Sequence, residues 1–313
     1  MNTQNAIFAL ILICTGLLSF KNRPVHISKQ SIRVDTIQTA GLFDANEKPK
    51  LIARHFSFTE GASVDKKGNV FFTDQPNNKI WEYTTDGQLF VFMDNAGRSN
   101  GTYFDKKGNL VTCADEHNQL WSITPRKKVK VLVDNLDGHL LNGPNDIWID
   151  ANGGIYMTDP YYQRDYWERK KPDLDGQNVY YLSKGSKSPV KVASDLKQPN
   201  GIVGTPDGKH LYVADIRDNK TFKYTIGLNG ALSDKKLFTE QGSDGMTLDE
   251  KGNVYLTGKG VTVYNPEGIK IVHIDIEEPW TANLCFSGRK KDLLFITASQ
   301  AVYVLKMKVR GVE

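Results

Sequence analysis

Apolar and polar residues alternate over short stretches along most of this chain, and the stretches are rich in β-branched and aromatic residues. Gly, Asn and Asp separate them, as in residues 64–74 (VDKKGNVFFTD), where two such stretches flank a Gly-Asn turn. Period-two alternation with this punctuation is typical of β-strands joined by hairpins. Beyond residue 20, no segment shows a convincing helical period. The pattern predicts an all-β protein.

The two-stranded motif of residues 64–74 is repeated. Its copies are FDKKGNLVTCAD (104–115), IDANGGIYMTD (149–159), TPDGKHLYVAD (205–215), LDEKGNVYLTG (248–258) and a degraded SGRKKDLLFITAS (287–299). The turn glycines Gly68, Gly108, Gly153, Gly208 and Gly252 are spaced by 40, 45, 55 and 44 residues, about one propeller blade each. Each of the first five units is completed by two further strand-like stretches, such as 79–85 and 89–94. The repeat therefore predicts a six-bladed β-propeller with four-stranded blades.

The sixth repeat ends after its third strand, whereas a strand-like segment, SIRVDTI (31–37), stands alone near the start. A propeller without long exposed sheet edges requires a complete last blade. We therefore expect this N-terminal strand to complete the sixth blade and to close the ring.

The N-terminus differs from the rest of the chain. Residues 1–20 carry no charged side chain, and residues 6–20 form an apolar run of the length of a signal-peptide core. The run is short for a membrane span of about 20 residues. We expect 1–20 to be a signal peptide or N-terminal anchor, 21–313 to be one propeller domain, and the protein to be exported, periplasmic or secreted. Lipid attachment at Cys14 and an uncleaved anchor are the alternatives.

Composition and charge exclude some partners. Lys and Arg number 40 against 36 Asp and Glu, a net charge of +4, and no basic run is interleaved with aromatic residues. This balance predicts no nucleic-acid partner. Beyond the apolar leader only Cys113 and Cys285 remain, both in apolar strands, where buried free thiols are expected rather than a disulfide. No Cys/His cluster has zinc-ligand spacing.

Polar side chains stand eight residues before each turn glycine. They are Glu60, Asn100, Asn145, Asn200 and Asp244, while Ala282 or Asn283 is nearest in the sixth repeat. These positions begin the innermost strands, which line the central channel of a propeller. Because the same position in each blade lies at the same height, we expect a ring of oxygen-bearing side chains at one channel mouth.

Two interpretations of this ring are available. Asn-Gly and Asp-Gly are common turn dipeptides, so the residues could serve only as punctuation. Turns, however, require neither Glu60 nor the Pro-Asn-Asp of 144–146. Two adjacent carboxylates also repel each other unless a cation lies between them. An all-oxygen set without thiolate or imidazole favours a divalent metal cation, Ca²⁺ first, with Mg²⁺, Mn²⁺ or Zn²⁺ as alternatives.

Four motifs carry a family resemblance. TEG (59–61), LNGPND (141–146), QPNG (198–201) and SDGM (243–246) resemble the gluconolactonase/regucalcin (senescence marker protein) family, within a group that includes calcium-dependent phosphotriesterases and paraoxonases. The resemblance spans about residues 55–300. It implies a catalytic divalent metal held by Glu60, Asn145, Asn200 and Asp244. It also implies that Asp244 transfers the proton.

The residues expected to bind the substrate resemble those of the family less closely than the metal ligands do. Regucalcin-like members hold a sugar lactone with an Arg two residues before the Asn-Asp asparagine, where this chain has Gly143. Our candidates for substrate binding are Asn100, Asp146, His139 and three aromatic residues of the long 160–177 loop, namely Tyr161, Tyr162 and Trp167. The loop follows a strand that returns to the ligand face, so it should overhang the metal. Its aromatics could instead pack on the neighbouring blade, and His139 could be structural.

These features predict a metal-dependent hydrolase of a small-molecule lactone. In this hypothesis the cation polarises the carbonyl and Asp244 moves the proton. A phosphotriesterase- or arylesterase-like hydrolase acting on an ester at the same ring is one alternative. A non-catalytic secreted propeller that binds its partner through one face is the other.

Overall fold

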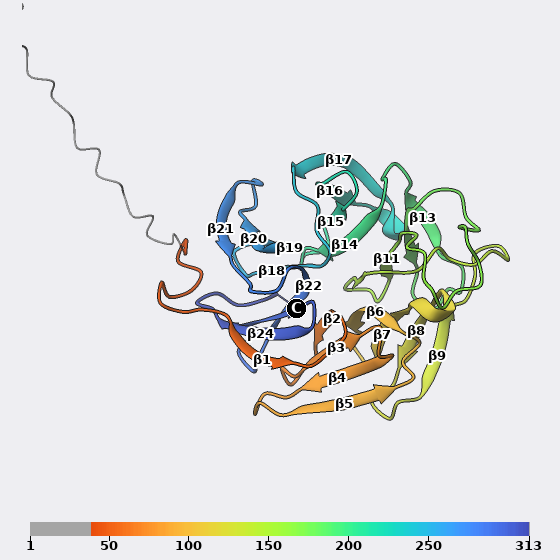
Figure 1. Ribbon diagram of the computed structural model, residues 1–313. Helices are drawn as coiled ribbons and strands as arrows, with labels where there is room; N and C mark the ends of the chain where they lie inside the picture. Colours follow the sequence, from red (N-terminus) through yellow and green to blue (C-terminus); the bar gives the residue numbers. More distant parts are fainter. Residues whose placement is uncertain (1–38, 313) are drawn as a thin grey trace, which may run out of the picture. The chain divides into compact units, whose positions relative to one another are not determined.

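The computed structural model describes residues 39–312, which form six four-stranded antiparallel blades around a central axis (Figure 1). The predicted six-bladed propeller is confirmed. The expected signal peptide or anchor at 1–20 and the strand at 31–37 lie outside the described residues.

Each blade is a set of four antiparallel strands, and in blades 1 to 5 the strands follow one another outward from the channel in chain order. Blade 1 comprises β2 (Thr59–Val64), β3 (Val70–Asp74), β4 (Lys79–Tyr83) and β5 (Leu89–Asp94). Blade 2 comprises β6 (Ser99–Phe104), β7 (Leu110–Ala114), β8 (Gln119–Ile123) and β9 (Val129–Val133). Blade 3 comprises β10 (Ile147–Ile149), β11 (Ile155–Asp159), β12 (Asn178–Leu182) and β13 (Val190–Ala193).

Blades 4 and 5 repeat this order, whereas blade 6 takes its outermost strand from the start of the described chain. Blade 4 comprises β14 (Pro199–Gly204), β15 (His210–Asp215), β16 (Lys220–Ile226) and β17 (Leu232–Thr239). Blade 5 comprises β18 (Met246–Leu248), β19 (Val254–Gly258), β20 (Gly260–Tyr264) and β21 (Lys270–Ile274). Blade 6 comprises β22 (Thr281–Ser287), β23 (Leu293–Ala298), β24 (Ala301–Lys306) and β1 (Lys50–Arg54). Two short 3₁₀ turns, η1 (Asp115–His117) and η2 (Leu228–Gly230), complete the described elements.

The ring closes through an N-terminal strand, as expected, but the strand is β1 rather than 31–37. β1 pairs antiparallel with β24, from Lys50 opposite Val304 to Arg54 opposite Ala301. The KLIAR sequence of β1 is short and charged at both ends, so it gives little strand signal by itself. Its register shifts between Leu51 and Ala53 and none of its residues is buried, which explains why the alternation is weak.

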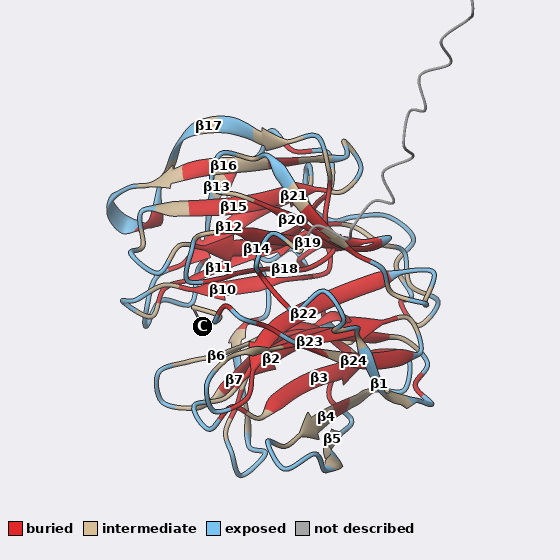
Figure 2. Ribbon diagram, turned by 90° about the vertical axis from the view of Figure 1, so that its left-hand side faces the viewer, coloured by how far each residue is buried: buried red, intermediate tan, exposed pale blue. Residues whose placement is uncertain are grey.

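Burial decreases from the channel outward. All residues of β2 and β3 are buried, whereas β5 has none that are, and Figure 2 shows the same gradient in the other blades. Apolar side chains fill the space between adjacent blades. The Trp148 indole of blade 3, for example, lies over Gly204 of blade 4, where a Cβ atom would come within 2.3 Å of the ring. Large aromatics facing glycines thus set the contact between these blades.

The repeated aspartate of the inner hairpins has a structural role. The Asp65 Oδ1 atom accepts hydrogen bonds from the backbone N–H groups of Lys67 and Asn69, at 2.8 and 2.9 Å. Asp105, Asp150 and Asp249 make the same pair of bonds in their own turns. Such Asx turns explain why the motif recurs.

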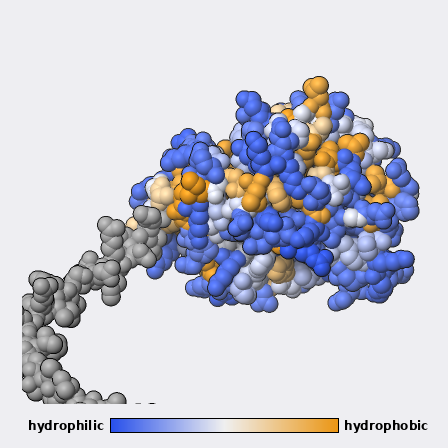
Figure 3. All heavy atoms as spheres, turned by 90° about the horizontal axis from the view of Figure 1, so that it is seen from above, coloured by the Kyte–Doolittle hydropathy of each residue, from blue (hydrophilic) through white to orange (hydrophobic). Residues whose placement is uncertain are grey.

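The described surface is largely hydrophilic on the face shown in Figure 3, with small hydrophobic groups scattered over it. Within residues 39–312, no helix has the length and apolar character needed to cross a bilayer. Cys113 and Cys285 are buried free thiols, as expected.

Candidate metal centre and active site

The five residues of the predicted ring begin the innermost strands of five consecutive blades. Glu60, Asn100 and Asn200 lie inside β2, β6 and β14, and Asn145 and Asp244 come just before β10 and β18. The strand register shifts next to this position in β2, β6 and β14. A β-bulge turns a side chain out of the regular alternation, and bulges are frequent at functional sites. All five side chains are buried and line one cavity of about 440 Å³.

The glycine that follows four of these residues is required by the next blade. A Cβ atom on Gly61 would lie 2.0 Å from the Asn100 carbonyl oxygen, and one on Gly201 would lie 2.6 Å from that of Asp244. Gly101 approaches the Asn145 carbonyl oxygen in the same way, and Gly245 approaches the side-chain amide of Asn283. Asn-Gly and Asp-Gly therefore do not form turns here. They lie at the start of inner strands, and the glycine allows each blade to approach the ligand position of its neighbour.

A second repeated aspartate, at the end of the second strand, fixes the backbone before three of the expected ligands. Its carboxylate accepts hydrogen bonds from two successive N–H groups, and the second of these groups lies two residues before the ligand. The bonds run from Ser57 and Phe58 to Asp74 (3.1 and 3.2 Å), from Asn142 and Gly143 to Asp159 (2.9 and 2.9 Å), and from Lys197 and Gln198 to Asp215 (2.6 and 3.0 Å). The same hydrogen-bonding arrangement thus fixes the backbone before Glu60, Asn145 and Asn200.

The environment of the two expected carboxylate ligands, Glu60 and Asp244, disfavours their ionised forms. Burial raises the pKa of Glu60 well above its usual value, and the negative charges of Asp244 and Asp146 raise it further. Burial also raises the pKa of Asp244, to about 6, although hydrogen bonds from Trp280 and Asn200 and the charge of Arg164 act in the opposite direction. Two buried carboxylates this close favour a compensating positive charge between them.

The amide of Asn200 supplies a direct test of whether a cation fits. Its Nδ2 atom donates to the Tyr162 hydroxyl at 3.0 Å, which fixes the orientation of the amide. Its Oδ1 atom is buried and has no hydrogen-bond partner. A buried carbonyl oxygen without a donor is costly unless another positive group reaches it. Two carboxylates and an unsatisfied amide oxygen on one cavity are the donors that a hard divalent cation prefers.

The predicted substrate-binding residues divide into two groups. Asn100 and Tyr162 line the cavity. His139 is exposed in a turn, and Asp146 is buried with its Oδ1 atom accepting the N–H of Ile147 at 2.9 Å. Neither residue is part of the cavity lining.

The aromatic loop after β11 divides in the same way. Trp167 is buried against blade 2 and donates its Nε1–H to the Asp115 carbonyl at 3.0 Å. Tyr161 packs on Trp167 with a ring-centroid distance of 5.9 Å, away from the cavity. Trp167 therefore packs on the neighbouring blade and Tyr161 packs on Trp167, while Tyr162 and Arg164 extend over the site.

Several lining residues were not among our candidates. Gln75, Ile216 and Trp280 complete the wall, together with Phe58 and Pro76. Gln75 and Ile216 immediately follow the second repeated aspartate in blades 1 and 4, as the loop of Tyr162 does in blade 3. The position directly after each of these aspartates is therefore the sequence signal that could have identified Gln75 and Ile216. Trp280 has no repeated motif beside it.

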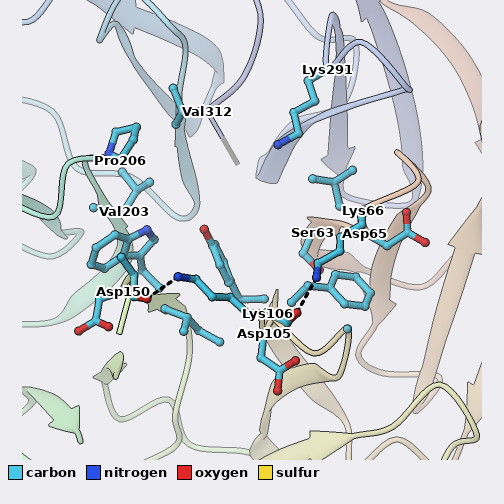
Figure 4. Close-up of a pocket in the computed structure, with 18 residues that line it drawn as sticks. Ser63, Asp65, Lys66, Asp105, Lys106, Asp150, Val203, Pro206, Lys291 and Val312 are labelled. Carbon is cyan, nitrogen blue, oxygen red and sulfur yellow. Dashed lines mark hydrogen bonds between the residues drawn. The ribbon is translucent and has the colours of Figure 1, made fainter. Parts of the chain in front are cut away.

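A second cavity, of about 470 Å³, lies at the other ends of the inner strands (Figure 4). Lys66 and Lys106 reach across it, and each donates a hydrogen bond to the backbone of the following blade. The carboxylates of Asp65, Asp105 and Asp150 at its rim are occupied by their own turns. This cavity is slightly larger than the one at the ring. Its carboxylates, unlike the Asn200 Oδ1 atom of the ring, already have hydrogen-bond partners.

Trp280→Phe should weaken divalent-cation binding about 10-fold. Trp280 Nε1 donates to Asp244 Oδ2 at 2.6 Å, and a hydrogen bond to a charged group contributes about 1.5–3 kcal/mol. Calorimetric titration of the metal-free protein with Ca²⁺ measures the change. Trp81→Phe is the control, because the buried Trp81 Nε1 atom has no partner to lose. Equal cation affinity in Trp280→Phe and wild type would contradict the role of this bond.

Comparison with known proteins places the chain in a family. The model of the SMP-30/Gluconolactonase/LRE-like region matches residues 58–300. A gluconolactonase of Zymomonas mobilis is 27% identical over 319 residues, covering 91% of this chain and 87% of the relative. The structure of a putative gluconolactonase superposes with a TM-score of 0.81 at 28% identity, covering 88% of this chain and 97% of that one.

A more distant structure has the same fold. The calcium-binding protein regucalcin of Agrobacterium tumefaciens superposes with a TM-score of 0.73 at 16% identity, covering 85% of this chain and 95% of that one. The family match includes Glu60, Asn145, Asn200 and Asp244 and spans most of the propeller. The sequence motifs, the fold and the matched region agree, and the chain belongs to the SMP-30/gluconolactonase/LRE-like family.

Proposed function

We propose that this protein is a divalent-metal-dependent hydrolase that opens lactones. The observation that carries the proposal is the set of buried oxygen groups on one cavity, in which the Asn200 Oδ1 atom has no partner and both carboxylates have raised pKa values. Membership of a family that includes gluconolactonases supports the choice of a lactone as substrate.

Glu60, Asn145, Asn200 and Asp244 would hold the cation, which when bound would polarise the ester carbonyl. The two asparagines bind without adding charge, so they leave the cation electrophilic. Tyr162 keeps the Asn200 amide in the orientation in which its oxygen faces the cavity.

We assign the proton transfer to the carboxylate of Asp244. Trp280 and Asn200 hydrogen bond to this carboxylate and fix its position in the cavity. As a base it would take a proton from the attacking water, and as an acid it would return the proton to the departing ring oxygen. The products balance as one hydroxy acid from one lactone and one water.

The walls above the ring favour an enzyme over a flat binding module. Loops from blades 1, 3 and 4 and the segment before β22 surround the cavity, contributing Gln75, Arg164, Ile216 and Trp280. A cavity of about 440 Å³ with convergent polar groups suits a small molecule.

The test is hydrolysis of a panel of sugar, aliphatic and aromatic lactones, together with an aryl ester and a phosphotriester. We expect lactone turnover that a chelator abolishes and Ca²⁺ restores. Faster turnover of the aryl ester or the phosphotriester than of any lactone would favour an arylesterase- or phosphotriesterase-like hydrolase instead. No turnover on any compound at saturating metal would overturn the hydrolase proposal and favour a binding module.

Cation binding should weaken as the pH falls. In the metal-free protein burial raises the pKa of Asp244 to about 6 and that of Glu60 well above its usual value, so a cation must displace protons at acidic pH. Titration with Ca²⁺ at pH 5 and pH 8, in buffers of different ionisation enthalpy, should show weaker binding at pH 5 and proton release. An affinity independent of pH would be inconsistent with ligation by these carboxylates.

A further inference from the structure

The aspartate that ends the second strand has a different partner in blade 2. Its counterparts Asp74, Asp159 and Asp215 hold backbone N–H groups before a ligand. Asp115 instead accepts the Nε–H of Arg164 at 2.9 Å and the hydroxyl of Tyr166, both from the loop of blade 3. The repeated carboxylate is thus used in blade 2 to fix a guanidinium group.

The contact with Asp115 uses the Nε atom of Arg164 and leaves the Nη1 and Nη2 donors for a ligand. Arg164 lines the 440 Å³ cavity, and its carbon Cζ lies 5.5 Å from the centre of the Tyr162 ring. Among residues 39–312, no protein group accepts a hydrogen bond from its Nη1 or Nη2 atoms. Because Nε is tethered and the group is planar, the direction in which these donors point is set before a ligand arrives.

Gln75 supplies a second unused donor. The residue is only 7% exposed and lines the same cavity from the loop after β3. Its Nε2 atom is buried and has no hydrogen-bond partner. An unsatisfied buried amide N–H is costly and indicates an acceptor that the protein itself does not provide.

The two donors are held by neighbouring blades. Gln75 comes from blade 1, and Arg164 is anchored on blade 2, whereas Ile216 and Trp280 approach from blade 4 and from the segment before β22. The wall therefore combines hydrogen-bond donors held by blades 1 and 2 with apolar surface from Ile216, Trp280, Phe58 and Pro76. The positive charge of Arg164 is already paired with Asp115, so the wall carries no surplus charge that would favour a phosphate group.

We infer that Gln75 and Arg164 are specificity-determining residues that bind hydroxyl oxygens on one edge of a neutral lactone ring. The inference rests on the proposed lactone hydrolysis. The hydrocarbon face of the ring then packs on Ile216 and Trp280. Both donors contact substituents rather than the ester group, so they act on the choice of substrate and not on the bond that breaks.

The experiment compares a hydroxylated δ-lactone with unsubstituted δ-valerolactone in Arg164→Met and Gln75→Leu. For the hydroxylated substrate kcat/KM should fall about 10- to 100-fold in Arg164→Met and about 2- to 10-fold in Gln75→Leu. At pH 8 and saturating Ca²⁺, where the ring carboxylates are ionised whether or not Arg164 is present, both variants should stay within about 3-fold of wild type for δ-valerolactone. Arg126→Met and Gln88→Leu are the controls, because both residues are exposed in turns and lie outside the cavity lining.

Equal losses on the two lactones would overturn the inference, and so would a wild-type preference for a phosphorylated lactone over the neutral one. Binding of the corresponding δ-lactams, measured by calorimetry, separates this result from failure of the proposed hydrolysis, since lactams keep the ring substituents but lack the ester. If no lactone is hydrolysed, weaker binding of the hydroxylated lactam by the variants still supports the inference. Unchanged lactam binding contradicts it.

Discussion

Asp244→Asn should lower kcat by about 10²- to 10⁴-fold even at saturating metal, the range expected when an acid–base group is lost. The substitution keeps an oxygen that can bind a cation and accept the Trp280 Nε1–H. It removes one negative charge and the ability to take up a proton. Steady-state kinetics over increasing Ca²⁺ separates the two effects, since weaker metal binding is corrected by excess cation and loss of the base is not.

Asn200→Ala is the matched comparison. It removes a neutral ligand and leaves both carboxylates in place, so its activity should recover far more as the metal concentration rises. Near-wild-type turnover of Asp244→Asn at saturating metal would exclude Asp244 from proton transfer. That role would then pass to Glu60 or to bulk water.

Gly201→Ala should destabilise the fold by about 1–3 kcal/mol, the usual cost of overpacking, and should also weaken metal binding. Its Cβ atom would lie 2.6 Å from the Asp244 carbonyl oxygen, so blades 4 and 5 must separate or the Asp244 backbone must shift. Thermal unfolding measures the first effect. Titration with Ca²⁺ measures the second.

Gly227→Ala is the control for this substitution. Gly227 also has a backbone conformation open to alanine, but the nearest atom to its Cβ would be the Ala231 carbonyl oxygen at 3.5 Å, an ordinary contact. We expect wild-type cation affinity in this variant. If Gly201→Ala also bound the cation normally, the close approach of the blades would not set the position of Asp244.

The sequence was sufficient to predict the propeller and the ring because both depend on repetition. Six copies of one hairpin motif define the blades, and a constant offset from the turn glycine places Glu60 and Asp244 on one mouth of the channel. Family resemblance added the roles of these residues. Periodicity could not identify the closing strand, because β1 is a short outer strand outside the repeat.

The upper wall of the site could not be derived in this way. Gln75 and Ile216 share one offset, directly after the second repeated aspartate, but the repeat does not show which residues at that offset face the cavity. Trp280 has no repeated motif beside it. Trp167 and Tyr162 are five residues apart in one aromatic loop, yet one packs on blade 2 and the other extends over the cavity. The direction of each side chain depends on contacts with Asp115 and Asn200, which are remote in sequence.

The pairing of β1 with β24 has a consequence for the order of folding. The strands that complete the last sheet begin at Lys50 and at Ala301, so this contact spans nearly the whole domain. Such long-range contacts carry the largest loop-closure entropy and form slowly. Glu60 and Asp244 belong to blades 1 and 5, with blade 6 between them across the gap. During synthesis the cation site therefore cannot be completed until the final strands emerge, and a chain truncated before β24 should neither close nor retain the metal.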